Sequence, residues 1–151
     1  MVAAVALIAA ASWLGPQEFE TVGGKAFSLQ SALARGPVVM VFRSSWLPDA
    51  SSTIPTISEI ERTAAEHGWP GAIVIFQDDN AAAAQALGGD ASGFPKLLDR
   101  RGALLRQFQV TRAPSLLIVD RDGSVISRSG LDPTQVRAAL QALAQRSLGS
   151  H

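Results

Sequence analysis

The stretch that decides the fold covers residues 38–55 and reads VVMVFRSSWLPDASSTIP. Residues 38–42 are apolar and rich in β-branched side chains, which predicts a buried central strand over 38–43. After a polar turn, apolar residues recur every three or four positions, and this spacing predicts a helix over about 49–66. A strand, a tight loop and a helix start therefore follow one another within this stretch.

The expected helix carries an apolar stripe and an internal proline. The stripe would face the sheet and consists of Ile54, Ile57, Ile60 and Ala64. Pro55 cannot donate a hydrogen bond to the residue four positions earlier, so we expect it to kink the helix. His67 and Gly68 predict the helix end, because a cation favours the C-terminal dipole and glycine favours a left-handed cap.

The loop between strand and helix resembles a known redox motif without its sulfur. Thioredoxin-type enzymes carry Trp-Cys-Pro-x-Cys after the central strand. The corresponding residues of this chain are Trp46, Leu47, Pro48, Asp49 and Ala50. A proline five residues after the second motif cysteine also matches, at Pro55. On these residues the chain resembles the membrane-anchored, periplasmic TlpA-like branch of the redoxins in the thioredoxin superfamily, with both motif cysteines replaced.

Two later segments extend the resemblance to roughly residues 19–146. Residues 94–99, with Gly102 after them, resemble the entry to the second half of the family domain. Residues 110–115, followed by 116–123, resemble its cis-proline loop, strand and hairpin. The resemblance implies an α/β thioredoxin-like fold, with a central mixed sheet flanked by helices, an N-terminal β-hairpin and the central insertion of the TlpA type.

The remaining chain alternates short strands with helical segments, which is typical of one α/β domain. Besides the central strand, we expect strands at 71–77, 97–98, 116–119 and 124–128, and a small hairpin within 19–29. Besides the helix at 49–66, we expect helices at 28–35, 81–87, 102–109 and from Asp132 onward. The strand at 71–77 should be parallel to the first because a helix connects them. These elements predict a five-stranded mixed sheet between about four helices.

The amino-acid composition excludes several classes of function. The chain has 151 residues, of which 47% are apolar and 17% charged, and this suits one domain with an ordinary core. Equal numbers of basic and acidic residues, 13 each, give no electrostatic reason to bind nucleic acid. The absence of cysteine excludes dithiol exchange, thiolate peroxide reduction and Cys-ligated metal clusters. Asp78, Asp79 and Asn80 are better explained as a helix cap than as a cation site, so we expect no metal and no cofactor.

The N-terminal segment 1–14, MVAAVALIAAASWL, carries no charge and ends before a Gly-Pro pair. As a helix it would reach about 21 Å, less than the roughly 30 Å hydrocarbon core of a bilayer. Three interpretations are open: an uncleaved membrane anchor, a cleaved secretory signal, or an apolar helix packed on the domain or a partner. We therefore divide the chain into an apolar segment 1–16, a thioredoxin-like domain 17–147 and a tail 148–151. We expect a domain that faces the periplasm at a bacterial inner membrane, or a soluble periplasmic domain after cleavage.

No other residue is expected to replace the missing nucleophile. Leu47 stands where the first cysteine would lie, and it has no lone pair with which to attack. Asp49 beside a helix start is stabilised as a carboxylate and should be a poor general acid. The nearby serines would need a base, and His67, the one histidine outside the tail, lies at the far end of the helix. We therefore expect no catalytic residue.

The resemblance also implies a groove that binds a partner's chain. In the family the bond equivalent to Ala113–Pro114 is cis, and the residue before the proline presents its backbone to an extended substrate segment. The expected groove is lined by Trp46, Leu47, Pro48, Arg112, Ala113 and Pro114. Leu47 would make it more apolar and Arg112 would make it cationic. The alternative is that the fold alone requires both prolines.

Two functions follow from these expectations. The first is a catalytically silent domain that acts as an accessory, assembly or binding subunit of a membrane-associated protein complex on the periplasmic side. The alternative is a thiol–disulfide oxidoreductase or peroxiredoxin-family member by descent, which would need cysteines from a partner.

Overall fold

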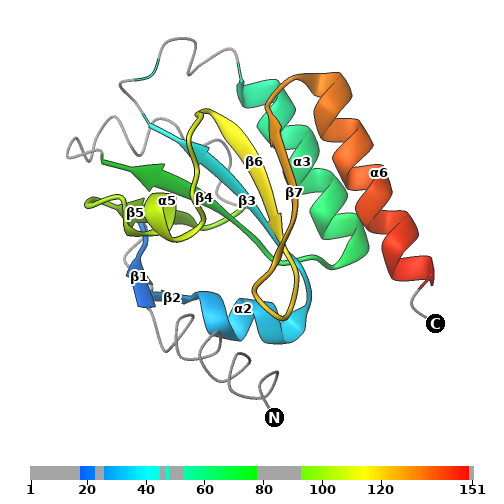
Figure 1. Cartoon of the computed structure of the whole chain (residues 1–151), viewed down its shortest axis with the longest axis horizontal. Coiled ribbons are helices and arrows are strands. Elements are labelled where there is room, and N and C mark those ends of the chain that lie inside the picture. The colour runs from blue at the N-terminus through cyan, green and yellow to red at the C-terminus, as the bar shows by residue number, and fades with distance from the viewer. Residues whose placement is uncertain (1–17, 23–25, 45–46, 48–52, 78–92, 150–151) are drawn as a thin grey trace.

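A five-stranded mixed sheet forms the centre of the structure (Figure 1). The computed structural model describes residues 18–22, 26–44, 47, 53–77 and 93–149. The strands, in spatial order, are β5 (Lys96–Asp99), β4 (Gly71–Phe76), β3 (Val38–Arg43), β6 (Ser115–Val119) and β7 (Val125–Gly130). β3, β4 and β5 are mutually parallel, whereas β6 pairs antiparallel with both β3 and β7. The predicted mixed sheet is confirmed, and so is the parallel pairing of β4 with β3.

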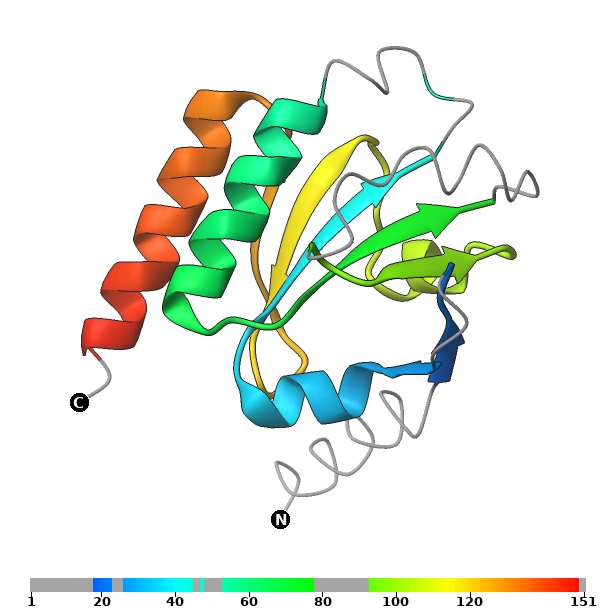
Figure 2. The ribbon, with the colours of Figure 1, turned by 180° about the vertical axis from the view of Figure 1, so that it is seen from behind.

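Helices cover both faces of the sheet, as Figures 1 and 2 show from opposite sides. They are α2 (Leu29–Arg35), α3 (Ile54–His67), α5 (Ala103–Gln107) and α6 (Pro133–Gly149). α3 and α6 lie side by side on one face, while α2 and α5 pack on the other. This is the α/β thioredoxin-like fold that the resemblance implies.

β3 is buried on both faces, and its side chains alternate between the two helical layers. Val39 and Val41 pack under α3 and α6. Val38, Met40 and Phe42 pack under α2 and α5. A strand covered on both sides needs apolar residues at every position, which explains the uninterrupted apolar run in the sequence.

The N-terminal hairpin is confirmed, and it closes one edge of the sheet. β1 (Glu18–Glu20) pairs antiparallel with β2 (Ala26–Ser28). Thr21 then bridges to Leu97 in β5, and the Val22 N–H donates to the Lys96 carbonyl at 2.9 Å. The outer edge of β5 is therefore paired in part, and β7 forms the opposite edge of the described sheet.

Three predicted helix ends are confirmed by their hydrogen bonds or dihedral angles. The Ser28 hydroxyl accepts from the Ser31 N–H at 3.2 Å at the start of α2. An Asp132 carboxylate oxygen accepts from the Gln135 N–H at 3.1 Å at the start of α6. Gly68 ends α3 in the left-handed region, with φ of 71°. These local signals worked because each depends on residues within one helical turn.

Two expected helix limits are wrong. α3 begins at Ile54, after Thr53 as N-cap, and not near Asp49. Pro55 therefore lies in the first turn, where its missing N–H would have no partner within the helix, so the expected kink has no cause. α6 continues to Gly149, although we expected a tail from residue 147 or 148. No proline or glycine interrupts the chain between Pro133 and Gly149, so nothing ends the helix earlier.

Several expectations lie outside the described residues. They concern the apolar segment 1–14, the Asp78-Asp79-Asn80 cap, the helix at 81–87 and the central insertion, whose place between β4 and β5 includes residues 78–92. Within the described part of the chain, no helix combines the length and apolar character needed to cross a membrane.

Gly71 at the start of β4 lies directly against the ring of Phe94. A Cβ placed on Gly71 would overlap this ring. Phe94 itself is partly buried and packs against the core beneath α3 and α6. Its backbone N–H donates to the Glu61 carboxylate of α3, which limits how far it can move. The close approach of strand and ring therefore requires glycine at this position.

We predict that Gly71→Ala lowers the free energy of unfolding by about 1–3 kcal/mol, because the added methyl group overpacks the site. Urea denaturation measures this loss. Gly130→Ala is the matched control, since its Cβ would meet no described atom nearer than Gln135 Oε1 at 3.7 Å. In a Phe94→Ala background, Gly71→Ala should cost much less. An equal loss in both backgrounds would contradict the proposed contact.

Candidate functional site

The degenerate motif begins at the C-terminal end of β3. Ser44 is buried there, and its carbonyl accepts from the Leu47 N–H at 3.3 Å, which closes a tight turn. The half-buried Leu47 side chain packs against the core beneath α2 and α5. The other predicted motif residues lie outside the described part of the chain, namely Trp46, Pro48, Asp49 and Ala50.

The cis-proline loop comes to the same end of the sheet because β6 is antiparallel to β3. Phe42 near the end of β3 pairs with Ser115 at the start of β6. The residues that follow β3 and those that precede β6 must therefore leave the sheet together. The Ala113–Pro114 bond is cis, as the resemblance implies. Ala113 packs against the same core layer as Leu47.

An open pocket of about 550 Å³ lies beside the cis-proline loop. Its walls come from the loop, the start of β6, the end of β7 and the first turn of α6. The described polar residues of the lining are Thr111, Arg112, Ser115, Arg128, Ser129 and Gln135. The predicted groove residues Arg112, Ala113 and Pro114 all line this pocket. The described Leu47 is not among the residues that line this pocket, and whether Trp46 and Pro48 form its other wall stays a prediction.

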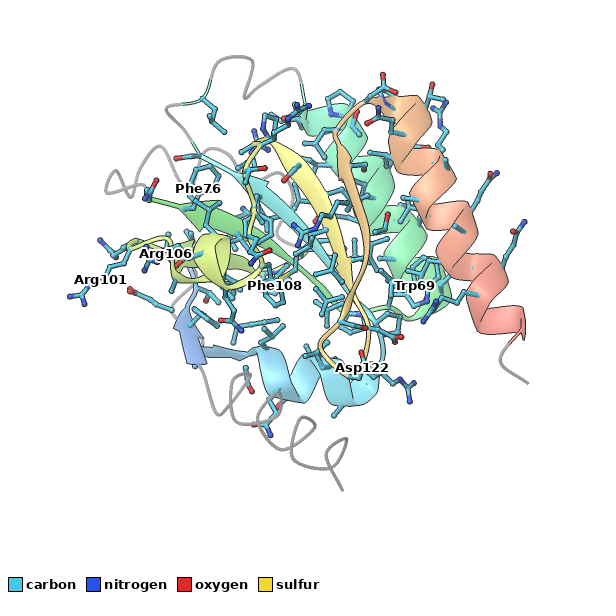
Figure 3. The ribbon with its side chains drawn as sticks, in the orientation of Figure 1. Trp69, Phe76, Arg101, Arg106, Phe108 and Asp122 are labelled. Carbon is cyan, nitrogen blue, oxygen red and sulfur yellow. The ribbon has the colours of Figure 1, made fainter. Side chains whose placement is uncertain are left out.

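Arg128 of β7 ties the loop to the sheet, a role that the sequence analysis missed. Its Nη2 donates to the Phe108 carbonyl at 2.6 Å, and its Nη1 donates to the Gln109 carbonyl at 3.3 Å. These carbonyls lie at the end of α5, where unpaired acceptors and the negative end of the helix dipole favour a cation. Phe108 is buried beside α5, and Figure 3 labels it. The guanidinium therefore fixes the start of the segment that leads to the cis bond.

Asp99 fixes the other end of α5. Its side chain is 3% exposed, so it is essentially removed from water. One oxygen accepts from the Ala103 N–H at 2.7 Å, and the other accepts from Leu104 at 3.0 Å and Leu105 at 3.4 Å. A carboxylate at a helix start satisfies donors that the helix cannot pair itself. Asp99 and Arg128 together hold α5, and α5 positions the cis-proline loop.

Arg43 is a buried charge at the end of β3. The residue is 1% exposed, and burial lowers the pKa of its guanidinium from the ordinary value. Strand alternation places its side chain on the face of Val39 and Val41, beneath α3 and α6. The sequence predicts the strand end here but gives no sign that an arginine would be enclosed.

Among the residues considered as replacements for the missing thiol, the structure describes His67, which lies away from Leu47. Within the described ranges, no cluster of three His, Cys, Asp or Glu side chains could hold a metal ion. His67 ends α3, where it stacks on Trp69 with ring centroids 4.3 Å apart. α3 has 14 residues and is therefore about 21 Å long, so His67 lies far from the loop that precedes the helix. Trp69 and Asp122 mark this opposite end of the sheet in Figure 3.

The fold and the site define a thioredoxin-like domain in a chain that contains no cysteine. A family model described as Redoxin matches residues 12–143. The chain therefore belongs to the Redoxin family. No curated protein matches the chain.

Solved structures share this fold at low sequence identity. DsbF of Mycobacterium tuberculosis, in mixed oxidised and reduced forms, gives a TM-score of 0.69 at 24% identity and covers 87% of this chain and 97% of its own. A secreted M. tuberculosis disulfide oxidoreductase homologous to E. coli DsbE gives a TM-score of 0.68 at 17% sequence identity. The match covers 87% of this chain and 98% of that one. The exposed lipoprotein thioredoxin of Streptococcus pneumoniae gives a TM-score of 0.68 at 21% sequence identity. The match covers 83% of this chain and 98% of that one. These similarities show the fold.

We predict that Arg128→Met lowers the free energy of unfolding by about 1 kcal/mol and loosens the loop, because two carbonyls lose a charged donor. Hydrogen exchange provides a local measurement, since the Val110 N–H donates to the Leu105 carbonyl at 2.8 Å and should exchange faster in the variant. Arg112→Gln is the matched control, because Arg112 makes no hydrogen bond within the described residues. Unchanged Val110 exchange in Arg128→Met would contradict the anchoring role.

Proposed function

We propose that this chain is a catalytically silent thioredoxin-like domain that acts as an accessory, assembly or binding subunit of a membrane-associated complex on the periplasmic side. One observation carries the proposal. The Redoxin fold retains its cis-proline loop and an open pocket beside it, although the chain contains no cysteine.

The missing sulfur removes the family's electron transfer. Thiol–disulfide exchange needs a thiolate that attacks a disulfide sulfur, and a second thiol that resolves the mixed disulfide. Leu47 supplies neither a nucleophile nor a proton donor, and the whole chain lacks cysteine. The remaining role of this site is to provide a surface that binds a partner protein.

The backbone of the cis-proline loop suits an extended partner segment. Within the described residues, the N–H and C=O groups of residues 111–113 make no hydrogen bond, and Thr111 and Arg112 are exposed. Unpaired backbone groups at such an edge can pair with an added strand. The adjoining pocket would hold side chains of that strand.

The location is proposed from the N-terminal segment and from structural relatives. Residues 1–14 carry no charge and would anchor the domain to the inner membrane, as in the TlpA-like branch. Among similar structures, one is a secreted oxidoreductase and another is an exposed lipoprotein. A soluble periplasmic domain, released by signal cleavage, is the alternative.

A second candidate is an oxidoreductase, of the thiol–disulfide or peroxiredoxin type, that uses cysteines from a partner. Its support is the structural similarity to a disulfide oxidoreductase. This candidate requires turnover when the partner is present, whereas the first requires none.

We predict that the chain does not accelerate insulin reduction by dithiothreitol, because it has no thiol to carry the exchange. The double variant Leu47→Cys with Ala50→Cys should accelerate the reaction at least about tenfold over the wild type, since a pair of thiols that can exchange with a disulfide is then present in the motif. The pair Leu47→Ser with Ala50→Ser is the control and should remain inactive. Turnover by the wild type alone would overturn the silent-domain proposal.

We predict that gentle detergent extraction of native membranes yields the chain within a larger assembly, because its proposed role is that of a subunit. Native mass spectrometry measures this directly. A species of 15.8 kDa alone would count against the subunit role. Deletion of residues 1–14 provides the control for membrane attachment and should release the domain from the membrane fraction unless partner contacts hold it.

A further inference from the structure

We infer that the pocket beside the cis-proline loop selects an extended protein segment with an acidic side chain. This inference rests on the proposed binding function and adds the chemistry of the partner. It concerns the part of the pocket near Arg112 and Arg128.

The charge of the pocket lining differs from that of the chain as a whole. The chain as a whole is neutral, with 13 basic and 13 acidic residues. The described lining of the pocket nevertheless contains two arginines and no acidic residue. Asp132 precedes the adjoining helix α6, where its carboxylate accepts from the Gln135 N–H; it keeps its negative charge but is not part of the lining. The pocket is therefore a positive site on a neutral protein, which attracts carboxylates.

Arg112 has no partner of its own among the described residues. The described ion pairs involve Arg100, Arg137 and Arg146, each with a carboxylate within 4.0 Å. Arg112 is exposed and belongs to none of them. A guanidinium presents a planar fork that matches a carboxylate with two parallel hydrogen bonds. Arg112 is thus the group that would pair with the incoming side chain.

Arg128 differs from Arg112 because it is held in place. Its two bonds to the Phe108 and Gln109 carbonyls fix the guanidinium at the pocket wall. A fixed charge adds to the attraction without losing side-chain entropy on binding. The pocket thus combines one exposed arginine, Arg112, that would contact the ligand, and one hydrogen-bonded arginine, Arg128, that would contribute its positive field.

The volume of the pocket and the unbonded backbone groups at its edge favour an extended polypeptide segment as the ligand. A volume of about 550 Å³ is far more than one carboxylate needs and falls in the range that holds a ligand of several groups. The unbonded backbone of residues 111–113 offers strand pairing, and Ser115, which strand register places on the same face as Arg128 and Gly130, adds a hydroxyl to the lining. Apolar Val110 and Leu116 also contribute to the lining. An extended segment with an acidic residue between apolar or hydroxyl neighbours fits these groups.

The test is an array of random nonapeptides probed with the purified domain, followed by fluorescence anisotropy on the best binders and their Glu→Gln and Glu→Lys versions. We expect acidic peptides to be enriched. We expect the Glu version to bind about fivefold more tightly than the Gln version at low salt, with a smaller difference at high salt. Arg112→Gln should remove this preference, and Arg112→Glu should reverse it in favour of Lys.

Two further variants make the result decisive. Gly130→Trp should abolish binding of all peptides, because Gly130 lines the pocket and a Cβ at this position would overlap no described atom, so the added indole can occupy the pocket. Arg101→Gln removes the same charge from an exposed arginine on the side of α5 away from β7 and should leave the preference unchanged (Figure 3). Circular dichroism verifies that each variant is folded.

Different outcomes of this test would contradict the proposed binding function and the inferred acidic preference. If no peptide binds, or if Gly130→Trp binds as well as the wild type, the groove is not a binding site and the proposed function loses its support. If peptides bind in the groove without an acidic preference, or if Arg112→Glu retains that preference, the binding function stands and the present inference is overturned.

Discussion

The burial of β3 on both faces is the constraint on which the rest of the structure depends. Its hydrogen bonds to β4 on one side and β6 on the other bring distant parts of the chain into one sheet. Since β6 runs antiparallel to β3, the loop after one strand and the loop before the other emerge at the same end. Leu47 and Ala113 are far apart in sequence, yet both pack against the same core layer. The geometry of the site is thus a product of strand pairing, and it does not need the sulfur chemistry that the enzymes of this fold perform.

The contacts that hold the cis-proline loop in place do not depend on the motif residues after β3. α5 is held by Asp99 at its start and by Arg128 at its end, and neither contact involves the motif residues. The loop, its cis bond and the adjoining pocket are therefore present in a chain that contains no cysteine.

The sequence predicted what depends on neighbouring residues and missed what depends on distant ones. The apolar run of β3 and the capping residues Ser28 and Asp132 act within a few positions, so their patterns were sufficient. The start of α3 was placed too early because polar residues before Ile54 fit a helix or a loop equally well. Arg128 reaches carbonyls about 20 residues earlier in the chain, and no local pattern encodes that contact. Predicting the enclosure of Arg43 would require knowing which helices cover the end of β3.

The hairpin at the start of the domain also limits how copies of this protein could associate. Thr21 and Val22 occupy part of the outer side of β5, whereas no described strand pairs with the outer side of β7. Growth of a continuous cross-β filament needs two open sides on every molecule, one to receive a neighbour and one to offer the next contact. Because Thr21 and Val22 cover part of β5, the side of β7 offers more open backbone to a second copy in the described sheet. Two copies that pair through β7 would form a symmetric dimer, in which neither β7 edge is left open for a third copy.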